Sequence, residues 1–384
     1  MLYWGERVDT TKERQQADTK VLKNKLETIR SEYRTAIKDT TKLFDGWDCA
    51  IEHLDSAANQ QTNKTFIDQM IKISNSCNVS MKSFAHTLIA RSIELCKQKP
   101  PCKFAAVAMG SLARGETTPY SDLEFLFLVE KKTSGSVKYF RLLAMTIYFL
   151  IGNLQETKLK YMNIEELKGF DDKGKNGFKI DGLQPKAGNI PTGNGRPEQK
   201  DKFILTVNQL ITMYKKIWNN PHPEESKKGD FTAMLGHTVL LYGDEALLEQ
   251  FESVKHSLTA NVERRKATEV MILQDVTDYD FLPLDELEKT FYKGNLKSAI
   301  YRYPSLLIYN LKLLFNIVST DSWQTLRKLH DRRIISDSFF ASLQLLLASA
   351  QYIRLAAYLY HDSQNENISF LQQSVAVPDE MKRK

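Results

Sequence analysis

The sequence predicts an α+β protein, in which a small mixed sheet is embedded in a mostly helical chain of 384 residues. Two short apolar runs, at residues 104–109 (FAAVAM) and 123–129 (LEFLFLV), have the length and the apolar content of buried strands. Helical spacing of apolar residues dominates before the first run and again after Lys202. A third strand is expected at residues 177–181 (GFKID), just before a Gly/Pro-rich loop.

Apolar spacing also divides the chain into three expected segments. Residues 1–79 form a helical extension, in which apolar residues recur every three or four positions along one helix face. The residues of that stripe are Leu22, Leu26, Ile29 and Tyr33. Residues 80–245 hold the sheet, and residues 246–384 form a C-terminal helical bundle.

Along the chain, helices are expected both before and after the two strands. One covers residues 81–97 and stops before Pro100, because proline removes a helix donor. Another covers residues 137–154, a long apolar stretch. From Lys202 to Tyr360 the pattern is helical again, and this includes residues 240–244.

Composition and charge narrow the functional classes. The net charge of +6 is mild, which disfavours a nucleic acid as partner. No membrane partner is expected, since the apolar stretch at residues 142–151 is far shorter than the roughly 20 residues of a membrane span. The chain starts without a secretory signal, and its four cysteines show no C-x-x-C pair, so we expect a cytoplasmic location.

The polar loop between the first two strands contains the candidate active site. Gly110 and Ser111 end the first strand, where the missing Cβ lets backbone N–H groups and the serine hydroxyl approach a triphosphate. Asp122 and Glu124 begin the next strand and share one face of it, because side chains alternate along a strand. Carboxylates at this spacing favour a hard divalent cation such as Mg²⁺.

The stretch from residue 109 to residue 130, GSxARGExxPxSDhEhxh at its centre, resembles the signature of DNA polymerase β-like nucleotidyltransferases. Its wording resembles the branch that contains protein-PII uridylyltransferase, the glutamine synthetase adenylyltransferase and related uncharacterised nucleotidyltransferases with a helical C-terminal domain. The resemblance implies that Asp122 and Glu124 are catalytic metal ligands, and that Gly110 and Ser111 bind the nucleotide.

The family has a third carboxylate on a later strand. Residues 180–188 (IDGLQPKAG) are similar to the corresponding stretch of the adenylyltransferase, which makes Asp181 the third metal ligand or the general base. The stretch lacks the family's first arginine, and Gln184 stands where the second would be. Asp230, at the start of an expected helix, is the competing candidate, and a strand carboxylate is better preorganised than one at a helix start.

Two basic residues are further candidates for nucleotide binding. Arg114 lies beside the Gly-Ser turn in the family, and its planar guanidinium suits phosphate oxygens. Lys297 lies in a segment that resembles the helical bundle of the same branch, where a basic residue can face the nucleotide.

The resemblance implies an enzyme that needs Mg²⁺ or Mn²⁺ and moves a nucleoside monophosphate from a nucleoside triphosphate, such as ATP or UTP, to a hydroxyl group. A protein is the expected acceptor, because the nearest relatives modify proteins, and a small molecule is the alternative. The competing hypothesis is a catalytically weak nucleotide-sensing or scaffold module in a larger assembly.

Overall fold

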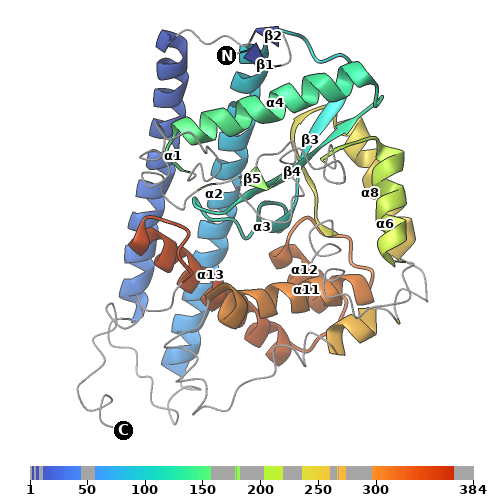
Figure 1. Cartoon of the computed structure of the whole chain (residues 1–384). Helices are drawn as coiled ribbons and strands as arrows, with labels where there is room; N and C mark the ends of the chain where they lie inside the picture. Colours follow the sequence, from blue (N-terminus) through green and yellow to red (C-terminus); the bar gives the residue numbers. More distant parts are fainter. Residues whose placement is uncertain are drawn as a thin grey trace. The chain divides into compact units, whose positions relative to one another are not determined.

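The structure is a computed structural model, and it has the α+β architecture that the sequence predicts (Figure 1). It describes residues 2–3, 6–7, 12–44, 57–156, 178, 180–181, 203–218, 236–259, 266, 268–273 and 296–366. Two compact units form. The first takes in Met1–Glu32 and Ser74–Ala267, and the second takes in Tyr33–Ile73 and Thr268–Lys384. These units are groupings by contact, so the expected division at residues 79 and 245 stays a prediction.

A mixed five-stranded sheet lies in the first unit. Its strands are β3 (Phe104–Ala108), β4 (Leu123–Val129), β5 (Ile180–Asp181), β6 (Ile204–Leu205) and β7 (Val239–Gly243). β3 runs antiparallel to both β4 and β7. The other edge of β4 pairs in parallel with β5 near its start and with β6 further along. A separate short hairpin joins β1 (Leu2–Tyr3) to β2 (Glu6–Arg7).

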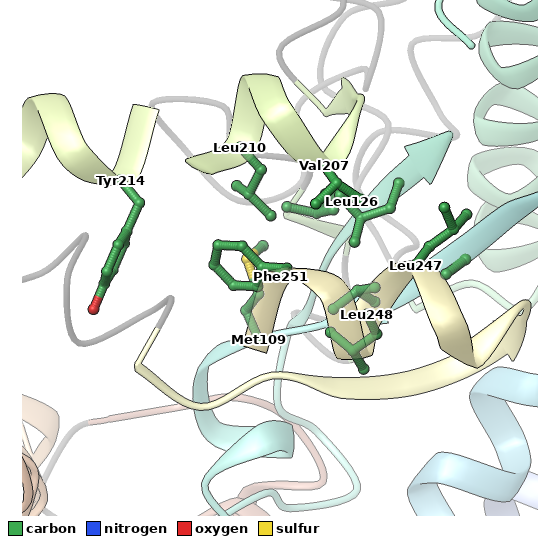
Figure 2. Close-up of a cluster of buried hydrophobic side chains, with 11 residues drawn as sticks. Met109, Leu126, Val207, Leu210, Tyr214, Leu247, Leu248 and Phe251 are labelled. Atoms are coloured by element: carbon green, nitrogen blue, oxygen red, sulfur yellow. The ribbon is translucent and has the colours of Figure 1, made fainter. Parts of the chain in front are cut away.

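Helices cover both faces of this sheet. On one face lies α4 (Ser134–Asn153) (Figure 1). The Phe140 ring of α4 packs against Phe104 and Phe127, with ring centroids 5.0 and 5.2 Å away. On the other face α6 (Val207–Trp218) and α8 (Glu245–Thr259) pack side by side over a buried apolar cluster (Figure 2). The strands contribute Ala105, Val107, Leu126 and Leu128 to that cluster, and Met109 joins it just after β3.

Two long helices precede the sheet, α1 (Lys12–Thr41) and α2 (Ala57–Cys96). The predicted stripe of α1 is confirmed, because Leu22, Leu26, Ile29 and Tyr33 are all buried. The helix expected at residues 81–97 is only the second half of α2, which begins at Ala57. Helix α2 also packs against the sheet: its His86 ring lies 5.0 Å, between centroids, from the ring of Tyr242 in β7.

The second unit contains the expected C-terminal helices. They are a π-helical turn, η5 (Lys297–Tyr301), and the helices α11 (Arg302–Leu314), α12 (Ser322–Asp331) and α13 (Asp337–His361). The side chains of Asp321 and Ser336 cap α12 and α13 by accepting a backbone N–H from the first turn. A 3-10 turn, η1 (Lys42–Phe44), follows α1.

Helix α13 alone, among the described residues, is long and apolar enough by length and composition to cross a membrane. The core helix of a folded domain passes the same test, and α13 buries the polar side chains of Gln351 and Arg354. Its composition is therefore weak support for a membrane span.

The continuous helical pattern predicted from Lys202 is wrong at two places. Residues 204–205 form β6, and residues 239–243 form β7 instead of part of a helix. In β7, pairing with β3 satisfies the backbone, and Gly243 ends the strand with a φ of 99°. A Cβ at Gly243 would overlap the carbonyl oxygen of Phe104, so this position requires glycine.

Candidate active site

Asp122 and Glu124 lie where β4 begins. Asp122 directly precedes the strand, and Glu124 is its second residue. Both are half-buried, whereas Leu123 and Phe125 between and after them are buried, so the predicted alternation is present. By the period of two, Glu124 shares its sheet face with Leu126, on the side covered by α6 and α8.

Gly110 brings the chain close to Glu124. It follows β3 and opens α3 (Gly110–Ala113), with a φ of 62° that disfavours other residues. A Cβ built on Gly110 would overlap the Glu124 carboxylate, which therefore lies against the glycine backbone. The backbone N–H of Met109 also donates to the carbonyl oxygen of Glu124 at 2.9 Å. These contacts hold the end of β3 and the start of β4 together, next to the Glu124 carboxylate.

The loop from Ser111 to Asp122 is held by its own hydrogen bonds. The N–H of Glu116 donates to the carbonyl oxygen of Ser111 at 2.9 Å, and the N–H of Ser121 donates to that of Thr118 at 3.0 Å. The Ser121 hydroxyl also accepts the N–H of Thr118 at 2.9 Å. Because Ser121 and Thr118 are buried, these hydrogen bonds fix the backbone just before Asp122.

Arg114 forms an ion pair within the same loop. Its Nε donates to Oε2 of Glu116 at 3.0 Å, and the Glu116 side chain is fully buried. Removal of Arg114 would leave the buried Glu116 carboxylate without its cation, which is strongly destabilising. This partner was not predicted from the sequence. A phosphate-binding role for Arg114 stays a prediction.

Strand β5 brings Asp181 to the same place in the sheet. Ile180 is paired with Leu123, and Asp181 is paired with Glu124, in a parallel register. Three acidic residues separated in sequence, Asp122, Glu124 and Asp181, therefore come together at one end of the sheet. Asp230, the competing candidate, lies outside the described residues.

Lys297 is not part of this arrangement in the first unit. It is half-buried and begins the π-helical turn η5 of the second unit. Its role in nucleotide binding stays a prediction.

The residues present suit a hard divalent cation. Asp122 and Glu124 supply carboxylate oxygens, the donors that Mg²⁺ and Mn²⁺ prefer, and Gly110 leaves the space in which the Glu124 carboxylate lies. Among the described side chains there is no group of three or more histidine, cysteine, aspartate or glutamate residues that could hold a metal. A metal site with Asp181 as a third ligand stays a prediction.

The segment from α2 to the end of α4 is similar to a known family. Residues 59–154 match the family model "Putative nucleotidyltransferase DUF294". The match supports the nucleotidyltransferase superfamily. It includes Gly110, Ser111, Arg114, Asp122 and Glu124, and it ends before Asp181. The comparison with curated proteins gives no match.

The family match tests only the coarser part of the resemblance described under the sequence. It supports nucleotidyl transfer in general, and it does not distinguish the uridylyltransferase and adenylyltransferase branch from others. It also begins inside α2, so the last part of the expected N-terminal extension, residues 59–79, belongs to the matched segment.

Two residues that contact the segments before Asp122 and Asp181 were not predicted from the sequence. Arg30 on α1 and Glu156 after α4 meet behind the loop that leads into Asp122. Arg30 follows Leu26 by four positions and precedes Tyr33 by three, so it lies on the apolar stripe of α1. A charged residue on a buried stripe was the signal that could have revealed it.

Proposed function

We propose that this protein transfers a nucleoside monophosphate from a nucleoside triphosphate to a hydroxyl group of a protein, and releases pyrophosphate. One observation carries the proposal: the Glu124 carboxylate lies against the Gly110 backbone, beside Asp122 and the backbone of Asp181. Gly110, Asp122 and Glu124 lie where the chain matches a nucleotidyltransferase family model, and Asp181 lies beyond the end of the match.

Each residue has a role in this proposal. Asp122, Glu124 and Asp181 would hold Mg²⁺ or Mn²⁺, which when bound neutralises phosphate charge and orients the triphosphate. Gly110 and Ser111 would bind the phosphates through backbone N–H groups and the serine hydroxyl. Arg114 is the proposed cationic contact beside the Gly-Ser turn, and Lys297 stays a candidate for nucleotide binding.

The reaction is a substitution at the α-phosphorus. The acceptor hydroxyl oxygen forms a bond to this phosphorus, while the bond to the oxygen that bridges to the β-phosphate breaks. Pyrophosphate leaves with that electron pair. The hydroxyl proton passes to a carboxylate, for which Asp181 is our choice, and a general base of this kind contributes about 10²–10⁴-fold to the rate.

Label transfer tests this function. The full chain is incubated with each common α-³²P-labelled nucleoside triphosphate, Mg²⁺ or Mn²⁺, and a lysate of host cells. We expect label on one protein band with one nucleotide. Asp122→Asn should lower the transfer by about a hundredfold or more, because phosphate charge would lose several kcal/mol of stabilisation.

Glu130→Gln is the matched control, since Glu130 is an exposed acid just beyond the opposite end of β4. It should leave the transfer unchanged. If nucleotide and metal raise the melting temperature but no label moves, the chain is instead a nucleotide-sensing or scaffold module. Equal transfer by Asp122→Asn and the wild type would remove the proposed site.

A further inference from the structure

Arg30 and Glu156 form a buried ion pair between α1 and the segment after α4. The Arg30 side chain has no exposed surface, and that of Glu156 is 6% exposed. The two nitrogens Nη1 and Nη2 of Arg30 donate to Oε1 and Oε2 of Glu156 at 2.8 and 2.7 Å. This is the two-pronged geometry in which guanidinium and carboxylate interact most strongly. Neither residue belongs to the segment that matches the family model.

Arg30 also contacts the loop that leads into Asp122. Its Nη2 donates to the carbonyl oxygen of Pro119 at 3.3 Å. Its guanidinium lies over the ring of Tyr120, 4.1 Å from the ring centroid, and Tyr120 is fully buried. These two residues directly precede Ser121 and Asp122. Arg30 therefore contacts the stretch of chain that leads directly into Asp122.

Glu156 contacts the segment that leads into Asp181. Its Oε2 accepts the backbone N–H of Phe178 at 3.3 Å, and Phe178 is buried against Phe84 of α2. Phe178 precedes Asp181 by three residues. This one ion pair thus contacts the chain just before Asp122 and again just before Asp181.

We propose that the Arg30–Glu156 pair is a positioning device, which sets the strand segments of Asp122 and Asp181 in register as metal ligands. This inference rests on the proposed function, because it assigns those carboxylates to one metal site. Neither Arg30 nor Glu156 touches the substrate in this account. They act through Pro119, Tyr120 and Phe178.

Stability alone gives a poor reason for burying this pair. Desolvation of two charges is expensive, and replacing a buried ion pair by apolar residues of similar volume is often neutral or stabilising. Burial by itself lowers the pKa of Arg30, but the hydrogen bond and negative charge of Glu156 outweigh this effect and the pKa is raised overall. Arg30 is therefore charged, and its hydrogen bond to the carbonyl oxygen of Pro119 is charge-assisted.

The competing explanation is that the Arg30–Glu156 pair only holds α1 in place. The contacts of Lys25 on the same helix provide a comparison. One turn earlier on α1, Lys25 donates to the Ser83 hydroxyl and to the Thr87 hydroxyl of α2, at 3.0 and 2.8 Å. These bonds also hold α1 in place. They involve none of the segments next to Asp122 or Asp181.

The test separates positioning from stability in the full chain. The variants are Arg30→Met/Glu156→Leu, Arg30→Lys and, as matched control, Lys25→Met. Three quantities are measured: the urea midpoint of unfolding, amide hydrogen exchange of residues 117–124, and the affinity for Mn²⁺ with a non-hydrolysable nucleoside triphosphate.

For the double apolar variant we expect a urea midpoint close to that of the wild type, because the unpaired charge is gone. Its amides in residues 117–124 should nevertheless exchange about tenfold faster. Its Mn²⁺ affinity should be about tenfold weaker, as when a group that orients a metal ligand is removed. Lys25→Met should leave both the exchange and the affinity unchanged.

A folded double variant with the exchange and the Mn²⁺ affinity of the wild type would overturn the proposal. If the double variant does not fold, Arg30→Lys decides, because an ammonium group lacks the planar fork that reaches Glu156 and Pro119 together. Wild-type Mn²⁺ affinity in Arg30→Lys would also overturn it. If the wild type binds no Mn²⁺ and transfers no nucleotide, the proposed function fails and the metal role of the pair falls with it. The exchange data then report separately on the loop.

Discussion

At the residue scale, Gly110 determines whether the Glu124 carboxylate can lie where it does. Glycine serves here for two reasons. The backbone has a positive φ of 62°, and the carboxylate occupies the space of a side chain. Any Cβ at this position would displace Glu124, the ligand that we propose to hold the metal.

Gly110→Ala should therefore lower both stability and nucleotide transfer. We expect a loss of about 1–3 kcal/mol in the free energy of unfolding, from the strained backbone conformation. Transfer should fall at least about tenfold, because the Glu124 carboxylate must move. Urea unfolding and label transfer measure the two effects.

Gly135→Ala is the matched control for this variant. Gly135 lies in the first turn of α4, and a Cβ there would meet only the Thr133 hydroxyl at an ordinary 3.8 Å. The alanine should leave transfer unchanged and should not lower stability, since alanine favours helices over glycine. Wild-type transfer by Gly110→Ala would show that the Glu124 position has no part in catalysis.

Residues of the site differ in how far the sequence reveals them. Asp122 and Glu124 could be recognised because strand alternation and the surrounding motif are both local in sequence. Arg30 could not be assigned a partner in this way. Glu156 is 126 residues away along the chain, and only packing within the first unit brings the two side chains together.

At the element scale, β3 and β4 were predictable and β7 was not. The two predicted strands are apolar runs bounded by turn residues, with every residue of β3 buried. The residues of β7 lie among helical patterns, and a five-residue apolar run fits either structure by periodicity alone. Its antiparallel pairing with β3, a contact distant in sequence, decides in favour of a strand.

The junction of β7 and α8 leads to a prediction about pH. Asp244 caps α8 by accepting the N–H of Ala246 at 3.1 Å, and it forms an ion pair with Lys103 at 3.2 Å. The hydrogen bond from Lys103 and that from Ala246 hold the pKa of Asp244 below its ordinary value of 3.8. This carboxylate therefore stabilises the fold above pH 3.8, and the effect is lost as pH falls through the lowered pKa.

Asp244→Asn should consequently be less stable than the wild type near neutral pH, while the asparagine still caps the helix. The difference in unfolding free energy should shrink as the pH drops below 3.8. Chemical denaturation across a pH series measures it. A Lys103→Met background should reduce the pH-dependent part, because Lys103 is the largest cause of the lowered pKa. A difference that grows towards acid would contradict this assignment.

At the scale of the whole molecule, the candidate site draws on segments far apart in the chain. The loop before β4 supplies Asp122, β4 supplies Glu124, and β5 supplies Asp181 through its parallel register with β4. The family match ends at residue 154 and therefore lacks β5. The cluster over the sheet likewise needs α6 and α8, which lie beyond the match (Figure 2). The site thus requires much more of the chain than the matched segment.

The location of a bound Mn²⁺ ion tests this account most directly. Crystals of the full chain with Mn²⁺ and a non-hydrolysable nucleoside triphosphate would be measured at a wavelength where manganese scatters anomalously. We predict a manganese peak within ligand distance of Asp122, Glu124 and Asp181, with the triphosphate next to Gly110 and Ser111. A nucleotide bound elsewhere, or a manganese ion held without Asp122 and Glu124, would contradict the proposed site.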